Sequence, residues 1–430
     1  MKILILNTSE RIGGAAVAAN RLMKALNKTG HEARMLVRDK QTDDERVISL
    51  NITWRHCLIN RFRFIWERLM IFFHNRFTKK NLFAVSIANT GNNISKHPLV
   101  KEADIIHLHW INQGFLSLKN IRQLTKLNKP IVWTMHDMWP GTGICHHAGI
   151  CEGFRNKCGY CSFLRKQGEK DLSHHVWKQK RFFCKKNIHF VTVSRWLASK
   201  VKQSSLIGQS AVTVIPNVID TAVFQPGDKL LARKDLGLPY DKKIILMGAA
   251  KLNDPIKGFG YLRDALEILT ATDSKENYLL LLFGSIKNAP NFLSNLPIAA
   301  LYLGTFTQTQ DLVKLYQAAD VTVAPSLYET FGQTISEAMA CGCPAVSFDN
   351  SGQTDIIEHQ VNGYLATYQS AEDLAAGIRW VLSEADYVSL SGKAVEKVRS
   401  YYSEWIVAGE YIDFYEKISN FVKNHKYNEP

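Results

Sequence analysis

Apolar residues along the chain alternate between short continuous runs and longer helical patterns. The first run, residues 3–6, precedes a helical pattern at 15–27, and the next run is 33–37. Short apolar runs are typical of parallel strands buried on both faces, and helices connect such strands. The beginning of the chain therefore predicts a strand–helix–strand unit.

The same alternation continues in two series, which predict an α/β fold with two doubly wound, Rossmann-like domains. We place the N-terminal domain at 1–207, the C-terminal domain at 208–400 and a final aromatic, amphipathic segment at 401–430. The remaining predicted strands are 104–110, 131–134 and 190–193 in the first half, and 244–247, 278–283, 300–303, 321–324 and 345–348 in the second.

Length and composition agree with two globular domains. A chain of 430 residues is too long for one compact core, and 46% hydrophobic residues is ordinary for a globular protein. The net charge of +14 favours acidic partners without choosing among them. The first apolar run is too short for a signal peptide, and no run approaches the ~18 residues of a membrane span. We therefore expect a cytoplasmic protein.

Residues 54–80 interrupt the α/β rhythm with a basic, amphipathic helix. Seven arginines and lysines stand against one acid, Glu67, and large apolar residues form one stripe at helical spacing. Two interpretations stay open. The helix lies on an anionic membrane, at the inner face of the cell membrane, or it packs on the N-terminal domain.

Two carboxylates follow the fourth strand of the second half. Glu329 lies in a loop, and Glu337 lies eight residues later in a predicted helix. Gly332 allows a close approach to backbone, and the N–H groups at Gln333 and Thr334 open the helix and can hold an anion. Carboxylates for hydroxyl groups and amides for phosphate together suit a nucleotide-diphosphate sugar. The alternative is a turn with two solvated carboxylates.

This Glu-x7-Glu pattern resembles the motif of retaining glycosyltransferases of the family-4 type, which have the two-domain GT-B fold. The resemblance extends over nearly the whole chain. It implies transfer of a sugar from a UDP- or GDP-sugar to an acceptor hydroxyl, with retained configuration and no catalytic cofactor. It also implies that Glu337 holds the ribose and Glu329 the donor sugar, and that backbone at Phe331, Gly332 and Gln333 meets sugar and phosphates.

Further residues match the family pattern outside that motif. Lys251 and Lys257 follow a strand of the second half, where family members hold the donor diphosphate. The family usually has Arg where Lys251 stands, and Lys lacks the bidentate fork. Gly13 and Gly14 are expected to line the cleft between the domains. His136 follows a strand and is expected to contact the donor sugar, and the last helix of the GT-B fold crosses back to the first domain.

Four cysteines are spaced Cys145-x5-Cys151-x6-Cys158-x2-Cys161, with glycines between them. Four thiolates at such spacing can surround a tetrahedral ion, so we predict a structural zinc site. Free thiols, two disulfides and an iron–sulfur cluster are the alternatives. Four thiolates leave zinc no open position, so we expect no catalytic role for it.

Together with the cysteine segment, the resemblance is closest to bacterial enzymes of exopolysaccharide, capsule or lipopolysaccharide synthesis. A glycan, free or lipid-linked, is the implied acceptor. A GT-B sugar-nucleotide epimerase is the nearest alternative, since it needs no acceptor. A zinc-containing nucleic-acid-binding protein would explain the charge and the cysteines. It would not explain the glutamates, so we expect no nucleic-acid partner.

Overall fold

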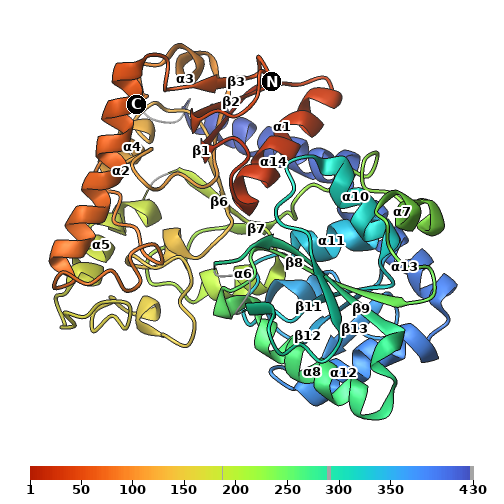
Figure 1. Ribbon diagram of the computed structural model, residues 1–430. Helices are drawn as coiled ribbons and strands as arrows, with labels where there is room; N and C mark the ends of the chain where they lie inside the picture. The colour runs from red at the N-terminus through yellow and green to blue at the C-terminus, as the bar shows by residue number, and fades with distance from the viewer. Residues whose placement is uncertain (186, 288–291, 427–430) are drawn as a thin grey trace. The chain divides into compact units, whose positions relative to one another are not determined.

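The structure is a computed structural model that describes residues 1–185, 187–287 and 292–426. It divides into two compact units (Figure 1). Unit 1 comprises Met1–Val218 together with the segment from Val407 onward, and unit 2 comprises Ile219–Ile406. Both units are parallel α/β domains, which confirms the fold class predicted from the alternating apolar runs.

Unit 1 is built on a parallel sheet with the strand order β3-β2-β1-β4-β5-β6-β7 among the described residues. The order reverses between β1 and β4, and ligands of α/β proteins bind at the carboxyl edge near such a reversal. The strands are β1 (Lys2–Ser9), β2 (Glu32–Asp39), β3 (Val47–Ser49), β4 (Ile105–Leu108), β5 (Ile131–Met135), β6 (Ile188–Thr192) and β7 (Val212–Val214).

The first helix of unit 1 buries the small apolar residues that its sequence places on one face, including Ala19, Leu22 and Leu26. The helices of this unit are α1 (Gly14–Lys28), α2 (Trp54–His74), α3 (Pro98–Glu102), α4 (Leu118–Leu124), α5 (Leu172–Lys180), α6 (Arg195–Lys202) and α14 (Glu404–Lys426), with 3-10 turns η1 (Trp139–Gly141), η2 (Gly153–Arg155) and η3 (Arg181–Lys185).

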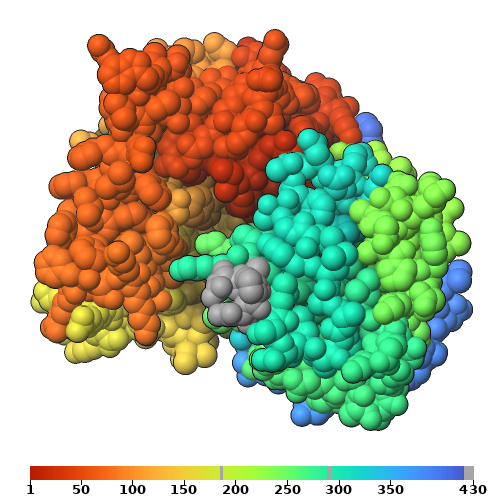
Figure 2. Space-filling view, viewed as in Figure 1, coloured from red at the N-terminus to blue at the C-terminus, as the bar shows by residue number. Residues whose placement is uncertain are grey.

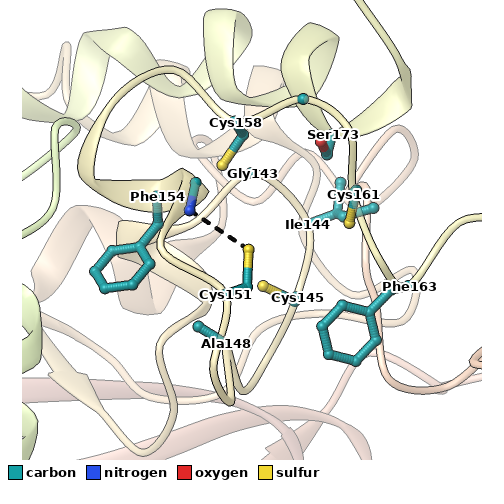
Figure 3. Close-up of a pocket in the computed structure, with 12 residues that line it drawn as sticks. Gly143, Ile144, Cys145, Ala148, Cys151, Phe154, Cys158, Cys161, Phe163 and Ser173 are labelled. Carbon is teal, nitrogen blue, oxygen red and sulfur yellow. Dashed lines mark hydrogen bonds between the residues drawn. The ribbon is translucent and has the colours of Figure 1, made fainter. Parts of the chain in front are cut away.

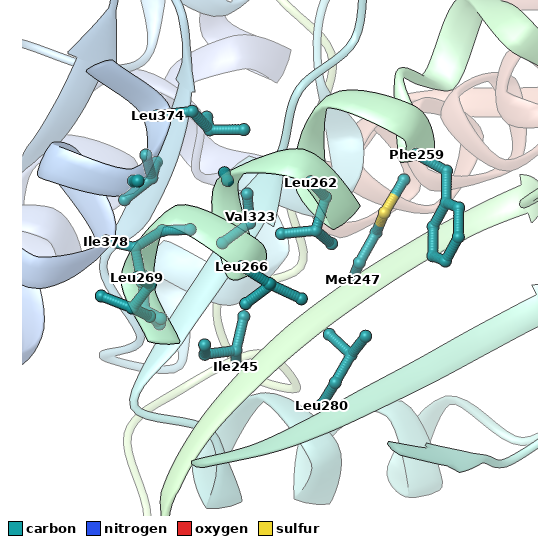
Figure 4. Packing of buried hydrophobic residues seen from close by; sticks show 14 of the residues in the cluster. Ile245, Met247, Phe259, Leu262, Leu266, Leu269, Leu280, Val323, Leu374 and Ile378 are labelled. Carbon is teal, nitrogen blue, oxygen red and sulfur yellow. The ribbon is translucent and has the colours of Figure 1, made fainter. Parts of the chain in front are cut away.

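Unit 2 repeats the architecture with the strand order β10-β9-β8-β11-β12-β13 in the described residues. Leu262, Leu266 and Leu269 lie one turn apart on α8 and pack against Ile245 and Met247 of β8 (Figure 4). The strands are β8 (Lys243–Lys251), β9 (Tyr278–Ser285), β10 (Ala299–Tyr302), β11 (Val321–Ala324), β12 (Ala345–Phe348) and β13 (Gly363–Ala366).

Helices α8, α10 and α11 of unit 2 lie between these strands in sequence, whereas α7 precedes β8 and α12 and α13 follow β13. The helices are α7 (Lys229–Asp235), α8 (Phe259–Thr272), α10 (Thr309–Ala318), α11 (Gln333–Ala340), α12 (Ala371–Arg379) and α13 (Tyr387–Tyr401), with short helical turns η4 (Pro255–Lys257), η5 (Lys275–Asn277), η6 (Ser351–Asp355) and η7 (Trp380–Glu384).

The first boundary between the units lies after Val218, eleven residues beyond the predicted 207/208. Strand β7 is the reason, because it pairs in parallel with β6 at the edge of the unit 1 sheet. Ile215 and Val218 also belong to the buried core of unit 1. Three residues in a strand give too short an apolar run to be recognised in the sequence.

The last helix, α14, returns to unit 1, as the family resemblance implied. Val407, Ala408, Tyr411 and Tyr415 are part of the unit 1 core. The Tyr411 hydroxyl lies 2.8 Å from Thr134 Oγ1 of β5. Unit 1 therefore completes its core with a segment that follows unit 2 in the chain.

Helix α2 ends at His74, short of the predicted Lys80, and it packs on unit 1 through a narrow face. Glu67 and Ile71 are fully buried, and Glu67 Oε1 accepts hydrogen bonds from the backbone N–H groups of Ile87 and Ala88. The predicted apolar stripe is turned outward and lies on the surface drawn in orange in Figure 2. No helix among the described residues is long and apolar enough to cross a bilayer.

Candidate functional site

Two loops meet at the carboxyl edge of the unit 2 sheet, because β8 and β11 are neighbouring strands. The backbone N–H of Leu327, after β11, donates to Ile256 O, after β8, at 2.8 Å. Gly258 has a φ of +70°, and a Cβ there would lie 1.9 Å from Pro325 O. Only glycine fits this contact, which brings the residues on either side of it together.

Lys257 and Glu329 form an ion pair at this contact. Lys257 Nζ lies 2.7 Å from Glu329 Oε2, and both side chains are partly exposed. The Glu329 loop is held by its backbone, since its N–H donates to Ser351 Oγ at 3.0 Å and its carbonyl accepts from Gly352 N at 2.7 Å. The charge of Glu329 raises the pKa of Lys257, so the ammonium is fully protonated at neutral pH.

Glu337 has a different environment, inside helix α11. Its side chain is buried, and the Tyr316 hydroxyl donates to Glu337 Oε2 at 3.0 Å. Tyr316 itself is buried on α10. The two glutamates predicted as a pair therefore have separate partners: one is fixed by a lysine, the other by a tyrosine.

The amino end of α11 lies between the two glutamates. Gly332 occupies the N-cap with a φ of +112°, no side chain caps the helix, and no acidic residue lies in its first turn. Gln333 and Thr334 begin the helix, and N–H groups in a first turn have no carbonyl acceptor within the helix. Phe331 is buried with its ring edge on Tyr402, which anchors the preceding backbone. This end suits an anionic group.

Lys251 lies at the exposed end of β8, after a register shift that begins at Gly248. It forms no ion pair with the other residues that the structure describes, whereas Lys257 is paired. The two predicted phosphate ligands thus lie at the same end of β8, Lys251 as its last residue and Lys257 beyond it, and of the two only Lys257 forms an ion pair among the described residues.

In unit 1 the predicted residues Gly13, Gly14 and His136 also lie at the carboxyl edge of the sheet, after β1 and β5. Gly13 and Gly14 are exposed, and Gly13 is the N-cap of α1 with a φ of +91° and no side-chain cap. A Cβ at Gly13 would meet no atom of the described residues within 4 Å. Gly13 therefore leaves space beside the start of α1.

His136, itself partly buried, belongs to a chain of histidines with the buried His107 and His109. Its Nε2 lies 2.8 Å from His109 Nδ1, and the ring of His109 lies 4.3 Å from that of His107. His107 Nδ1 in turn lies 2.7 Å from the Tyr415 hydroxyl of α14. Burial lowers the pKa of His136 to about 4 and that of His107 to about 3, so both rings are neutral at pH 7.

Asp137 fixes the loop after His136. Its Oδ2 accepts from Trp110 Nε1 at 2.9 Å and lies 2.7 Å from His146 Nδ1, while its Oδ1 accepts from the Trp139 backbone. Burial alone would raise the pKa of Asp137, but the charge and hydrogen bond of His146 outweigh it and lower the pKa to about 2. This loop leads directly into the cysteine segment.

The four cysteines line one hollow in unit 1, together with Phe154 and Phe163 (Figure 3). All eight cysteines of the chain are free thiols. Burial raises the pKa of Cys158 and of Cys161 to about 11, so both are protonated at neutral pH. In the described part of the chain, no three His, Cys, Asp or Glu side chains are arranged to hold a metal ion as they stand.

Several residues at these sites were not identified from the sequence. Tyr316 and Ser351 hold the two glutamate segments, and His109 and Asn112 lie beside His136. Alternating polar residues in the otherwise apolar 104–110 run were the only signal for His109. Tyr316 lies in an ordinary helical pattern, which gives no signal of contact with a helix that begins 17 residues later.

Family models match both halves of the chain. Residues 12–223 match the family described as Glycosyltransferase Family 4, and residues 228–400 match that described as Glycosyl transferases group 1. An uncharacterized glycosyltransferase of Methanocaldococcus jannaschii is 31% identical over 239 residues, or 53% of this chain and 56% of that protein. The chain spans about half the length of the curated relatives it matches.

Solved structures share the architecture of the whole chain. Sucrose-phosphate synthase of Thermosynechococcus elongatus is 18% identical, covers 97% of this chain and 99% of its own, and has a TM-score of 0.68. HepE of Anabaena, in complex with UDP and glucose, is 16% identical with 96% and 99% coverage and a TM-score of 0.63. At these identities the likeness establishes the fold, which is GT-B.

Proposed function

Because the chain is built as a GT-B glycosyltransferase, with a matching family domain in each half, we propose that it transfers a sugar from a nucleotide-diphosphate sugar to an acceptor hydroxyl. The Lys257–Glu329 pair beside the uncapped start of α11 is the observation that carries this proposal. It offers a cation, a carboxylate and backbone N–H groups within one loop contact. The phosphates of a nucleotide sugar suit the cation and the backbone N–H groups, and its hydroxyls suit the carboxylate.

Each group of the donor has a candidate partner in unit 2. Glu337 is buried and oriented by Tyr316, which suits it to accept hydrogen bonds from the ribose hydroxyls. The start of α11 and Lys251 and Lys257 suit the diphosphate, and Glu329 suits a hydroxyl of the transferred sugar. Glu329 also keeps Lys257 oriented before the donor binds.

The proposed reaction retains the anomeric configuration. The bond between the anomeric carbon and the diphosphate oxygen breaks, and Lys257 stabilises the charge that develops on the leaving diphosphate. The acceptor oxygen attacks on the same face, and the departing phosphate oxygen takes its proton. For unit 1 we propose that His136 takes part in transfer and that Gly13 and Gly14 border the acceptor.

Donor binding and turnover test the proposal in sequence. A thermal-shift panel of UDP, GDP, ADP and their sugars should show one base that raises the melting temperature, because a ligand of the folded state stabilises it. With that donor, transfer should require an acceptor. Turnover of donor alone into its epimer would support the epimerase, and binding of none of the nucleotides would contradict both.

We propose that the acceptor is a glycan intermediate of exopolysaccharide, capsule or lipopolysaccharide synthesis, presented at an anionic membrane. The outward stripe of α2 supports the membrane: Trp54 is 67% exposed and Phe62 is 61% exposed, beside exposed arginines such as Arg61. Large exposed aromatic residues with flanking cations are typical of interfacial helices. Peripheral binding at the inner face of the cell membrane is the corresponding location.

We also propose that Cys145, Cys151, Cys158 and Cys161 bind a structural zinc ion. Protonated thiols do not bind metal, and an ion would displace their protons as it draws the sulfurs in. A buried lysine supports the site. Lys180 is fully buried, which lowers its pKa well below the usual value, and the negative charge of four thiolates around zinc would oppose that shift and favour its ammonium form.

Metal analysis tests the zinc site on protein purified without chelators. We expect about one zinc per chain, since four thiolates complete one tetrahedral shell. The double change Cys158→Ser and Cys161→Ser should remove it, while Cys57→Ser and Cys184→Ser, at exposed cysteines, should not. Less than half an equivalent in the unaltered protein would contradict the proposal.

A further inference from the structure

A small hollow lies at the carboxyl edge of the unit 1 sheet, where β4 and β5 end. Its lining includes His109, Trp110, Asn112, His136 and Asp137. The free space at its base is close to the size of a single water molecule, and the hollow is partly open. It therefore accommodates one oxygen-sized group of a larger ligand, and the rest of that ligand would lie outside the hollow.

Two buried polar atoms, on residues that line this hollow, have no hydrogen-bond partner among the described residues. They are His109 Nε2 and Asn112 Oδ1, on side chains that are only 3% and 2% exposed. The other nitrogen of His109 is already used by His136, at 2.8 Å. Because buried polar atoms are nearly always paired, two unpaired atoms on residues that line one hollow indicate a missing polar group.

We infer that His109 and Asn112 hold one hydroxyl group of a carbohydrate. A hydroxyl both donates and accepts, so it can serve a ring nitrogen and an amide oxygen at once. The carboxylate of Asp137 and the amide oxygen of Asn112 disfavour an anion. Burial lowers the pKa of His109 well below its usual range, so the ring is neutral and adds no charge to attract one.

The wall of the hollow favours a sugar over an isolated water. Trp110 is half-buried, and its indole is fixed by the hydrogen bond from Nε1 to Asp137 Oδ2 and by the nearby ring of His146. Binding sites for small polar molecules combine such an immobile aromatic surface with a few converging polar atoms. Residues of unit 1 thereby select among sugars by the position of one hydroxyl group.

The inference rests on the proposed sugar transfer and adds a specificity-determining pair to it. The hydroxyl belongs either to the acceptor or to the donor sugar, and both offer the same chemistry. The test uses the full chain with Asn112→Leu, which removes the amide oxygen at similar size. Asn112→Asp keeps an acceptor oxygen there, and Asn93→Leu, at an exposed asparagine of the same unit, is the matched control.

Two sets of probes separate the sources of the hydroxyl. Saturation-transfer NMR with methyl glycosides of glucose, galactose, mannose and N-acetylglucosamine reports an acceptor sugar. Calorimetry with UDP against UDP-glucose, and GDP against GDP-mannose, reports a donor sugar. We expect Asn112→Leu to weaken one set about fivefold or more, as loss of a hydrogen bond does, while Asn112→Asp and Asn93→Leu retain binding. Affinity for the nucleotide alone should not change.

The melting temperature without ligand distinguishes a binding role from a structural one. Asn112→Leu removes an unpaired buried oxygen, so the melting temperature should hold or rise. A lower melting temperature, unchanged affinity for every probe, or unaltered protein that binds no glycoside and treats nucleotide and nucleotide sugar alike would overturn the inference. Failure of the unaltered protein to bind any nucleotide would instead contradict the proposed function.

Discussion

At the scale of single residues, Lys257 has two successive partners in the proposed reaction. In the free protein Glu329 neutralises it at 2.7 Å. A donor diphosphate would bring negative charge to the same ammonium, so Glu329 would be released to accept a hydrogen bond from the sugar. The ion pair thus prepares both groups and prevents an uncompensated cation at the edge of the sheet.

Replacing Lys257 with Met should lower kcat by about 100-fold or more, because it removes charge stabilisation of the leaving diphosphate. Single-turnover rates at saturating donor measure this directly. Lys257→Arg keeps the charge and should recover part of the rate. A kcat within twofold of the unaltered enzyme would contradict the role of Lys257.

Replacing Glu337 with Ala should weaken nucleotide binding about 10- to 100-fold, the usual range for hydrogen bonds to a charged group. Calorimetry with the nucleotide that stabilises the protein measures it. Tyr316→Phe removes only the hydroxyl that orients Glu337, and a smaller loss is expected. Equal affinities in all three proteins would exclude Glu337 from the donor site.

The histidine chain predicts acid sensitivity. The pKa of His136 in the folded state is lowered by burial to about 4, below its ordinary 6.5. Its stabilising contribution is therefore complete above pH 6.5 and is lost as the pH falls toward 4. Within this window it gives a slope of about 1.4 kcal/mol per pH unit.

The melting temperature, followed by tryptophan fluorescence, should fall as the pH is lowered from 7 to 5. His136→Gln, which cannot protonate, should show a shallower fall. His107 and His109 remain in the variant and keep part of the slope. Identical pH profiles for the two proteins would show that His136 does not titrate as described.

Sequence reasoning proposed the two glutamates from one loop–helix segment, and Lys257 from its place after the first strand of the second half. It did not predict that Lys257 and Glu329 touch, since that contact joins residues 72 positions apart. The contact depends on β8 and β11 being neighbours, which is a matter of strand order. Likewise, nothing local marks Asn112 as buried and unpaired.

At the scale of elements, helix α2 has one face packed on unit 1 and one face exposed. The sequence had left packing on the N-terminal domain and binding to a membrane as alternatives. Ile71 packs inward together with Glu67, and most of the apolar stripe is exposed. Short strands were the main elements missed. β3, β7 and β13 have three or four residues each, and each pairs in parallel with the edge of a neighbouring strand.

Replacing Trp54, Phe62, Trp66 and Phe73 with Ser should reduce binding to vesicles of phosphatidylcholine and phosphatidylglycerol at least about tenfold. The loss follows from the apolar area that would no longer enter the interface. Flotation or tryptophan fluorescence measures binding. Val388→Ser, at an 82% exposed apolar residue of unit 2, should leave it unchanged. Unchanged binding of the fourfold variant would reject membrane contact through α2.

At the scale of the whole molecule, the two units differ in whether one continuous segment of the chain supplies the hydrophobic core. Residues 219–406 contain the entire core of unit 2, whereas the core of unit 1 includes Tyr411 and Tyr415 of α14. Both tyrosines are buried and bonded to unit 1 partners. One continuous segment therefore supplies the core of unit 2, whereas the core of unit 1 also needs residues of α14.

The two units produced as separate fragments should behave unequally. Residues 219–406 should unfold cooperatively and bind the nucleotide that stabilises the full chain. Residues 1–218 should lack a cooperative transition, because the site of α14 would expose apolar core. Adding residues 404–426 as a peptide should restore a transition. A fragment 1–218 that melts like the intact protein would contradict this dependence.

The return of α14 also has a consequence for biosynthesis. A ribosome that has finished residue 218 must still translate 188 residues of unit 2 before Val407 follows. At ordinary elongation rates this takes about 10 to 40 s. Throughout that interval the newly made first half presents an open apolar groove, because Val407 and the residues after it have not yet been translated. Molecular chaperones should therefore engage the nascent first half, and the order of maturation runs opposite to the order of synthesis.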